Sequence, residues 1–237
     1  MVNANYYMAD NEYRAGRHDA ALQYIDYVLA HGSDATFAED ALAMKGNIMM
    51  ARNDHKSALE TFRQLSKKAA TAENRTIAQI GMMRSASQLG RPSDVLEATT
   101  ALLANPKVTD EVAKEARYEH ATALASTGHK ADAVDHWKQL AKDSRSIYGA
   151  RSAYDLAEYY YDKKQYKDAE RTINALIDAG TPHQYWLARC FILLSDVYAK
   201  QGNKFEAKEY LESLKSNYPG KETDIFQMID SRLKVLK

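Results

Sequence analysis

The stretch Phe191–Pro219 reads FILLSDVYAKQGNKFEAKEYLESLKSNYP. It contains two segments with apolar residues at helical spacing, separated by a glycine. Gly202 can adopt the positive backbone angle that ends a helix, and a proline cannot continue one. Ser195 and Ala207 are small residues on either side of this turn, so two antiparallel helices can approach closely there. The stretch therefore predicts a helical hairpin.

A turn residue followed five positions later by a small residue recurs along the whole chain. Successive turns are separated by 36 to 38 residues, and this steady period indicates an internal repeat. The six pairs are Gly16/Ala21, Asn53/Ala58, Gly90/Val95, Gly128/Ala133, Lys164/Ala169 and Gly202/Ala207. Ten Gly and four Pro in 237 residues are too few for many tight turns, so the composition also favours helices.

These residues resemble the tetratricopeptide repeat (TPR) motif, in which small residues of two helices meet across a short turn. The matching positions in the quoted stretch are Phe191, Leu194, Ser195, Tyr198, Gly202, Ala207, Leu211 and Pro219. The resemblance covers residues 3–219. It implies an all-α, right-handed α-solenoid of about six helix pairs. It also implies that the first helices line a concave groove that binds a protein or peptide.

The period predicts six repeats and a closing helix. The repeats span residues 3–31, 36–69, 73–104, 109–142, 146–178 and 183–217. Residues 220–237 form an amphipathic segment in which Ile225, Met228, Ile229, Leu233 and Leu236 share one face, while Asp230, Arg232, Lys234 and Lys237 point elsewhere. This pattern is typical of a helix that caps a solenoid with a polar outer face.

The third repeat departs from the small-residue rule. Twelve residues before each small residue of the turn pairs lies a second close-contact position, which holds Ala9, Gly46, Met83, Ala121, Ala157 and Ser195. Met83 and its partner Val95 are both larger than the others. We therefore expect the third repeat to hold its helices further apart or to pack irregularly.

The first helix pair has no capping segment before it. Residues 6–9 (Tyr-Tyr-Met-Ala) already fall on packing positions. We therefore expect the chain to be a segment of a longer repeat protein, and the uncapped N-terminal pair is a candidate for self-association. The alternative is that the first repeat tolerates an open face.

The composition argues against several classes of partner. Thirty-two basic residues balance 32 acidic ones, so the basic excess of a nucleic-acid-binding protein is absent. No apolar run approaches the roughly 18–20 residues that span a membrane. We therefore expect neither nucleic-acid binding nor membrane insertion. The start of the sequence lacks the pattern of a signal peptide, and one cysteine does not report the redox compartment.

The search for catalytic chemistry gives no candidate. The seven histidines do not form the spacing of a zinc-binding helix, and a single cysteine provides no thiolate pair. Cys190 lies in a mostly apolar run, which favours buried packing over a nucleophilic role. No glycine-rich phosphate loop is present. We therefore expect no cofactor, no metal and no enzymatic activity.

The resemblance assigns groove positions to particular residues. The candidate partner-binding residues are Arg84, Tyr118, Arg151, Tyr154, Glu158, Tyr161 and Arg189. Tyr and Arg are enriched at binding hot spots. Core packing explains Tyr118, Tyr154 and Tyr161 least, so we expect these three rings to be exposed in the groove.

Two hypotheses for the function follow from the resemblance. The first is a non-catalytic protein-interaction scaffold; the alternative is a regulatory or substrate-presenting arm of a larger enzyme or of a secretion or assembly complex. The carboxylate clamp of chaperone-binding TPR proteins is excluded, because Ala43, Gly81, Tyr118 and Thr122 occupy its positions. The last repeat also resembles the C-terminal end of long bacterial cell-envelope TPR proteins. That likeness implies the periplasm or cell envelope, with the cytoplasm as the alternative.

Overall fold

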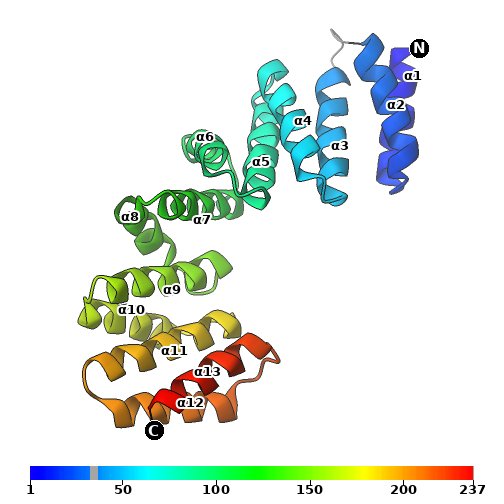
Figure 1. The fold of residues 1–237 in the computed structure, drawn as a ribbon. Helices are drawn as coiled ribbons and strands as arrows, with labels where there is room; N and C mark the ends of the chain where they lie inside the picture. Colours follow the sequence, from blue (N-terminus) through cyan, green and yellow to red (C-terminus); the bar gives the residue numbers. More distant parts are fainter. Residues whose placement is uncertain (33–36, 237) are drawn as a thin grey trace. The chain divides into compact units, whose positions relative to one another are not determined.

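The computed structural model describes residues 1–32 and 37–236, and these residues form 13 α-helices and no strand (Figure 1). The helices are α1 (Val2–Arg14), α2 (His18–His31), α3 (Phe37–Ala51), α4 (His55–Lys68), α5 (Ala72–Gln88), α6 (Pro92–Leu103), α7 (Asp110–Ser126), α8 (Lys130–Leu140), α9 (Ile147–Asp162), α10 (Tyr166–Ala179), α11 (Gln184–Lys200), α12 (Lys204–Asn217) and α13 (Thr223–Val235). The predicted start of the second repeat at residue 36 and the predicted end of the closing helix at 237 lie outside the described residues. The all-α repeat fold is confirmed.

The six predicted turn positions all have positive φ angles. Their values are 73° at Gly16, 59° at Asn53, 62° at Gly90, 88° at Gly128, 58° at Lys164 and 91° at Gly202. The left-handed backbone at these positions reverses the chain between two helices. Since Asn53 and Lys164 adopt the same geometry as the glycines, the period identified the turns even where the glycine is missing.

Lys164 carries a conformational cost that a glycine would remove. A side chain in the left-handed region costs about 1–2 kcal/mol, and the extra freedom of glycine in the unfolded chain returns about half of that. We expect Lys164→Gly to raise the free energy of unfolding by about 0.5–1 kcal/mol, measured by urea denaturation followed by circular dichroism. Lys164→Ala keeps the β-carbon and should bring no gain. An equal gain in both variants would contradict this account.

The chain divides into two compact units. Unit 1 is Met1–Thr127 with α1 to α7, and unit 2 is Gly128–Lys237 with α8 to α13. In unit 1, consecutive helices from α1 to α7 pack against one another, and α3 also contacts α1 and α5.

The centre of unit 1 is the ring of Phe62 on α4, which is 1% exposed. It lies between two glycines of neighbouring helices. A β-carbon added to Gly46 on α3 would lie 2.6 Å from Phe62 Cζ, and one added to Gly81 on α5 would lie 2.4 Å from Phe62 Cγ. The two glycines therefore leave the space that the ring fills.

The expectation of a loose third repeat is wrong. α5 and α6 contact each other as extensively as α3 and α4 do. Met83 and Val95 are 0% and 4% exposed, so both side chains fit into the core. An unbranched methionine adapts to the available space, which explains why the larger pair is tolerated.

Unit 2 repeats the same packing and ends with α13. α9 packs against α10 and α11 against α12, while α11 also contacts both α9 and α10. The close contact predicted for the last hairpin is present, because the buried Ser195 Oγ donates a hydrogen bond to the Ala207 carbonyl at 2.8 Å. α13 contacts α11 and α12 (Figure 1), so it takes the position that the first helix of another hairpin would have. Its buried side chains Ile225 and Ile229 are each 0% exposed.

Candidate functional site

A hollow of about 160 Å³ opens on unit 2 where α9, α11 and α13 lie next to one another; we call it the unit 2 groove. Its lining residues are Tyr154, Glu158, Tyr161 and Asp162 from α9, Arg189, Ile192, Leu193 and Asp196 from α11, and Met228 and Arg232 from α13. On each helix these residues follow the i, i+3, i+4, i+7 pattern or part of it, so they share one helical face. The groove is thus built by the repeat itself, with one face contributed by each of three helices.

A chain of hydrogen bonds joins the three helices beside the groove. The Tyr154 hydroxyl donates to Glu158 Oε1 at 2.6 Å and accepts from Arg189 Nη2 at 2.8 Å. Arg189 Nη1 donates to the Tyr185 hydroxyl at 3.1 Å, and that hydroxyl donates to Asp224 Oδ2 at 2.7 Å. We call these five residues the tyrosine–arginine chain. It fixes the side chains of Glu158 and Arg189 in the groove wall.

Aromatic rings surround the arginines of this region. The Arg189 guanidinium carbon lies 4.6 Å from the Tyr154 ring centroid, and that of Arg151 lies 5.0 Å from the Trp186 centroid. Cations over aromatic faces are stabilised by the ring quadrupole, more so when partly buried. Arg189 is therefore held in one orientation by two tyrosine hydroxyls and by the aromatic faces around it. Among the described residues, no carboxylate oxygen lies within 4.0 Å of its guanidinium nitrogens.

Two members of the tyrosine–arginine chain, Tyr154 and Arg189, keep their protonation states near neutral pH. Burial raises the pKa of the Tyr154 hydroxyl, and the hydrogen bond to the Glu158 carboxylate raises it further. Burial alone would lower the pKa of Arg189, but its hydrogen bonds to Tyr154 and Tyr185 leave it above its usual range. Tyr154 therefore remains a hydrogen-bond donor and Arg189 remains charged.

The closing helix contributes an ion pair to the groove. Arg232 donates to the Asp196 carboxylate through Nε, at 2.8 and 2.9 Å, and through Nη2 at 2.7 Å. The expectation that Arg232 points away from the packed face is wrong. Arg232 follows Met228 by one helical turn and lies with it at the edge of the apolar face, which α11 covers.

The structure separates the seven predicted site residues into two groups. Tyr154, Glu158, Tyr161 and Arg189 come together in the unit 2 groove, and Arg151 lies on the same helix as the first three. The remaining two, Arg84 and Tyr118, belong to unit 1. Their role in partner binding stays a prediction.

In unit 1, the Arg84 guanidinium is held by the Glu115 carboxylate of α7 through hydrogen bonds of 2.8 and 2.7 Å. Two of the three tyrosines are not exposed as expected: Tyr118 is 4% and Tyr154 is 8% exposed, while Tyr161 is partly buried. In unit 2 the reason is Arg189, which reaches over the Tyr154 ring from the next hairpin.

Removing only the Tyr154 hydroxyl should weaken the tyrosine–arginine chain. Tyr154→Phe keeps the buried ring but leaves Glu158 and Arg189 without their shared partner. We expect the free energy of unfolding of unit 2 to fall by about 1–2 kcal/mol, as for hydrogen bonds to charged groups, measured by urea denaturation. Tyr160→Phe is the control, since this phenol of the same helix belongs to neither the chain nor the groove. Equal losses would contradict the assigned role of the Tyr154 hydroxyl.

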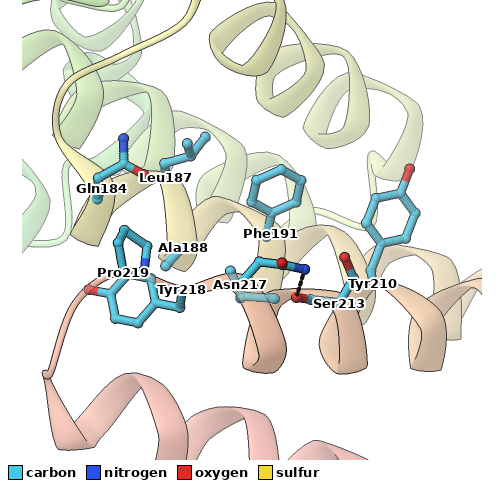
Figure 2. A pocket seen from close by; sticks show the side chains of 10 residues that line it. Gln184, Leu187, Ala188, Phe191, Tyr210, Ser213, Asn217, Tyr218 and Pro219 are labelled. Carbon is cyan, nitrogen blue, oxygen red and sulfur yellow. Dashed lines mark hydrogen bonds between the residues drawn. The ribbon is translucent and has the colours of Figure 1, made fainter.

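A second hollow, of about 200 Å³, lies between the two helices of the last hairpin (Figure 2). Its lining residues are Gln184, Leu187, Ala188 and Phe191 from α11, Tyr210, Ser213, Leu214 and Asn217 from α12, and Tyr218 and Pro219. Figure 2 shows the Phe191 and Tyr210 rings toward one end and Tyr218 and Pro219 toward the other. No charged residue is among these lining residues, so only apolar packing and neutral hydrogen bonds are available there.

The part of the chain that the structure describes contains no group of three or more His, Cys, Asp or Glu side chains that could hold a metal ion. Cys190 is fully buried, and burial raises the pKa of its thiol to about 12, so a reactive thiolate does not form near neutral pH. Within the same residues, each helix is too short or too polar to cross a membrane.

Comparison with known proteins agrees with this geometry. Residues 184–221, which contain the last hairpin, match the family model of the tetratricopeptide repeat. A tetratricopeptide repeat protein from Parabacteroides merdae ATCC 43184 superposes with a TM-score of 0.61 at 14% identity, covering 99% of this chain and 98% of the other. PilF of Pseudomonas aeruginosa gives 0.59 at 14% identity, covering 97% and 96%. PilW, a widely conserved type IV pilus biogenesis factor, gives 0.57 at 19%, covering 99% and 97%.

The fold and the repeated hairpins define an all-α helical-repeat protein. More specifically, the chain has the fold of tetratricopeptide repeat proteins and carries a repeat of that family at residues 184–221. No curated protein sequence matches it. Tetratricopeptide repeats generally mediate protein–protein interactions and are generally non-catalytic.

Proposed function

We propose that this chain is a non-catalytic interaction scaffold that binds a peptide or protein segment in the unit 2 groove. The observation that supports the proposal is the pre-organised wall of the groove. Arg189 is fixed by two tyrosine hydroxyls at 2.8 and 3.1 Å, and Glu158 is fixed by one of them at 2.6 Å. Side chains that are already ordered lose little conformational entropy when a partner binds.

The groove offers a partner both apolar area and charge. Tyr161 and Met228 provide apolar surface, while Arg189 and Glu158 provide opposite charges. Partly buried tyrosine and arginine side chains in a recess are the types that contribute most to binding, and the charges select the orientation of the partner.

The test compares proteins captured by the wild-type chain with those captured by Glu158→Gln/Tyr161→Ser. Glutamine keeps an acceptor for the Tyr154 hydroxyl, and Tyr161 is only partly buried, so the fold should persist. The control is Glu206→Gln/Phe205→Ser, which makes the same kinds of change at exposed positions of α12. Quantitative mass spectrometry identifies partners that depend on the groove. For such a purified partner, the groove variant should raise the dissociation constant at least about tenfold, roughly 1.4 kcal/mol. Equal capture by both variants would overturn the groove as the binding site.

A further inference from the structure

We propose that the outer face of α1 is a contact between two copies of this chain. The outer face consists of Asn3, Ala4, Tyr7, Met8 and Asn11, and all five residues are exposed. They lie opposite the buried Ala9, which packs into the core of unit 1. Tyr7 and Met8 are 63% and 47% exposed, and they are large apolar side chains.

The composition of this face is that of an interface. None of its five residues is charged, and the charged Arg14 follows Asn11 by one turn at the C-terminal end of this face. Depletion of charge together with Tyr and Met is typical of the central part of protein contacts. The exposed residues of other helices differ. On α4 they include Lys56, Glu60, Lys67 and Lys68, and on α12 Lys204, Glu206, Lys208, Glu209 and Glu212. The exposed residues of α4 and α12 are thus largely charged, whereas Arg14 is the one charged residue among the exposed residues of α1.

The internal repeat indicates what such a face packs against. The positions 37 residues after Ala4, Tyr7 and Asn11 are Ala41, Met44 and Ile48 on α3, which are 0%, 7% and 0% exposed. They form one apolar cluster with Ala21, Ile25 and Val28 of α2. The same side of α3 thus packs against a helix, and on α1 the corresponding positions are exposed.

A second copy of this chain can contact this face without bringing like charges together. A two-fold contact places the residues nearest the axis against themselves, so a charged face would bring like charges together. The outer face of α1 avoids this repulsion. The nearest charges, Asp10 and Arg14, are paired with each other at 2.8 Å; Arg14 is 77% exposed and lies at the C-terminal end of this face, about two turns from Tyr7. An axis passing between Tyr7 and Met8 makes the two α1 helices antiparallel and places Ala4 opposite Asn11.

Sedimentation equilibrium of the full chain over a concentration series tests the proposal. The wild type should form a dimer at concentrations of about 100 µM, an ordinary weak self-association. Tyr7→Glu should raise the dissociation constant at least about tenfold, because it buries a charge against its own copy. Phe205→Glu is the matched control, since Phe205 is 73% exposed on α12. A wild-type chain that stays monomeric, or a dimer unaffected by Tyr7→Glu, would overturn the proposal.

Cross-linking locates the axis in the same preparation. The only native thiol, Cys190, is fully buried and should not react. Met8→Cys places a thiol beside the proposed axis and should give a disulfide-linked dimer under mild oxidation. Ala15→Cys is also exposed, but it lies seven residues further along the chain, directly after the end of α1 and about 10 Å from the axis. Its two thiols are then too far apart to bond. Equal cross-linking of both variants, or none of Met8→Cys, would contradict the antiparallel contact.

Discussion

Phe62→Ala is expected to lower the free energy of unfolding of unit 1 by about 3–5 kcal/mol, the range for removing a large aromatic side chain from a core. The ring is 1% exposed and lies between Gly46 of α3 and Gly81 of α5. The backbones of α3 and α5 flank the cavity that the variant would contain. Because the two flanking residues are glycines, neither has a side chain that could turn into the cavity. The measurement is urea denaturation followed by circular dichroism, with hydrogen exchange of α4 and α5 amides to locate the loss in unit 1. Phe205→Ala, at a 73% exposed position, should change stability by no more than about 0.5 kcal/mol.

A double-mutant cycle separates the contact with Gly81 from a general loss of core. In the wild type, Gly81→Ala should destabilise by about 1–3 kcal/mol, because its β-carbon would lie 2.4 Å from ring atoms that cannot leave the core. In the Phe62→Ala background the same change fills part of the cavity and adds helix propensity of about 1 kcal/mol, so it should stabilise. A cost of Gly81→Ala that is equal in both backgrounds would contradict the steric explanation.

The architecture was predictable because its signals are local and repeated. Each turn position needs a particular backbone geometry, and the chain presents it at a constant period. The structure confirms positive φ even at Asn53 and Lys164, where no glycine marks the turn. The apolar spacing of α13 likewise identified Ile225 and Ile229 as its buried side.

The contacts between neighbouring hairpins were not predictable in the same way. Gly81 stands out only because Phe62 reaches it from α4, and Tyr154 is buried only because Arg189 covers it from α11. A motif records which residues face each other within a hairpin, but it does not record how far a long side chain reaches into the next one. Four of the predicted site residues line the groove. Arg232 and Tyr185 were missed for the same reason, because each reaches a partner on another helix. The spacing of Tyr185 and Arg189, four apart on one helix, was a signal that could have joined them.

The second large effect is expected at Gly149, in the first turn of α9. A β-carbon there would lie 1.9 Å from the backbone oxygen of Asp143 and 2.8 Å from that of Leu140. These oxygens belong to the end of α8 and to the connection that follows it. Unlike the end of a flexible side chain, they move only if the backbone between the two helices shifts. We therefore expect Gly149→Ala to lower the free energy of unfolding of unit 2 by about 3 kcal/mol or more, at the upper end of overpacking costs.

The sign of this change makes the test decisive, because at an ordinary helical position Gly→Ala stabilises by about 1 kcal/mol. The exposed Ala175 of α10 provides the control, where Ala→Gly should cost about that amount through propensity alone.

Urea denaturation gives the free energies, and the fluorescence of Trp137 reports on α8, since that ring is 4% exposed and lies 6.4 Å from Tyr159 of α9. Trp186→Phe in every variant leaves Trp137 as the single tryptophan. Gly149→Ala should expose Trp137 to solvent before unit 2 as a whole unfolds, because the strain falls on the connection between α8 and α9. A stabilised Gly149→Ala variant with unchanged Trp137 fluorescence would show that the two backbones do not approach this closely in solution.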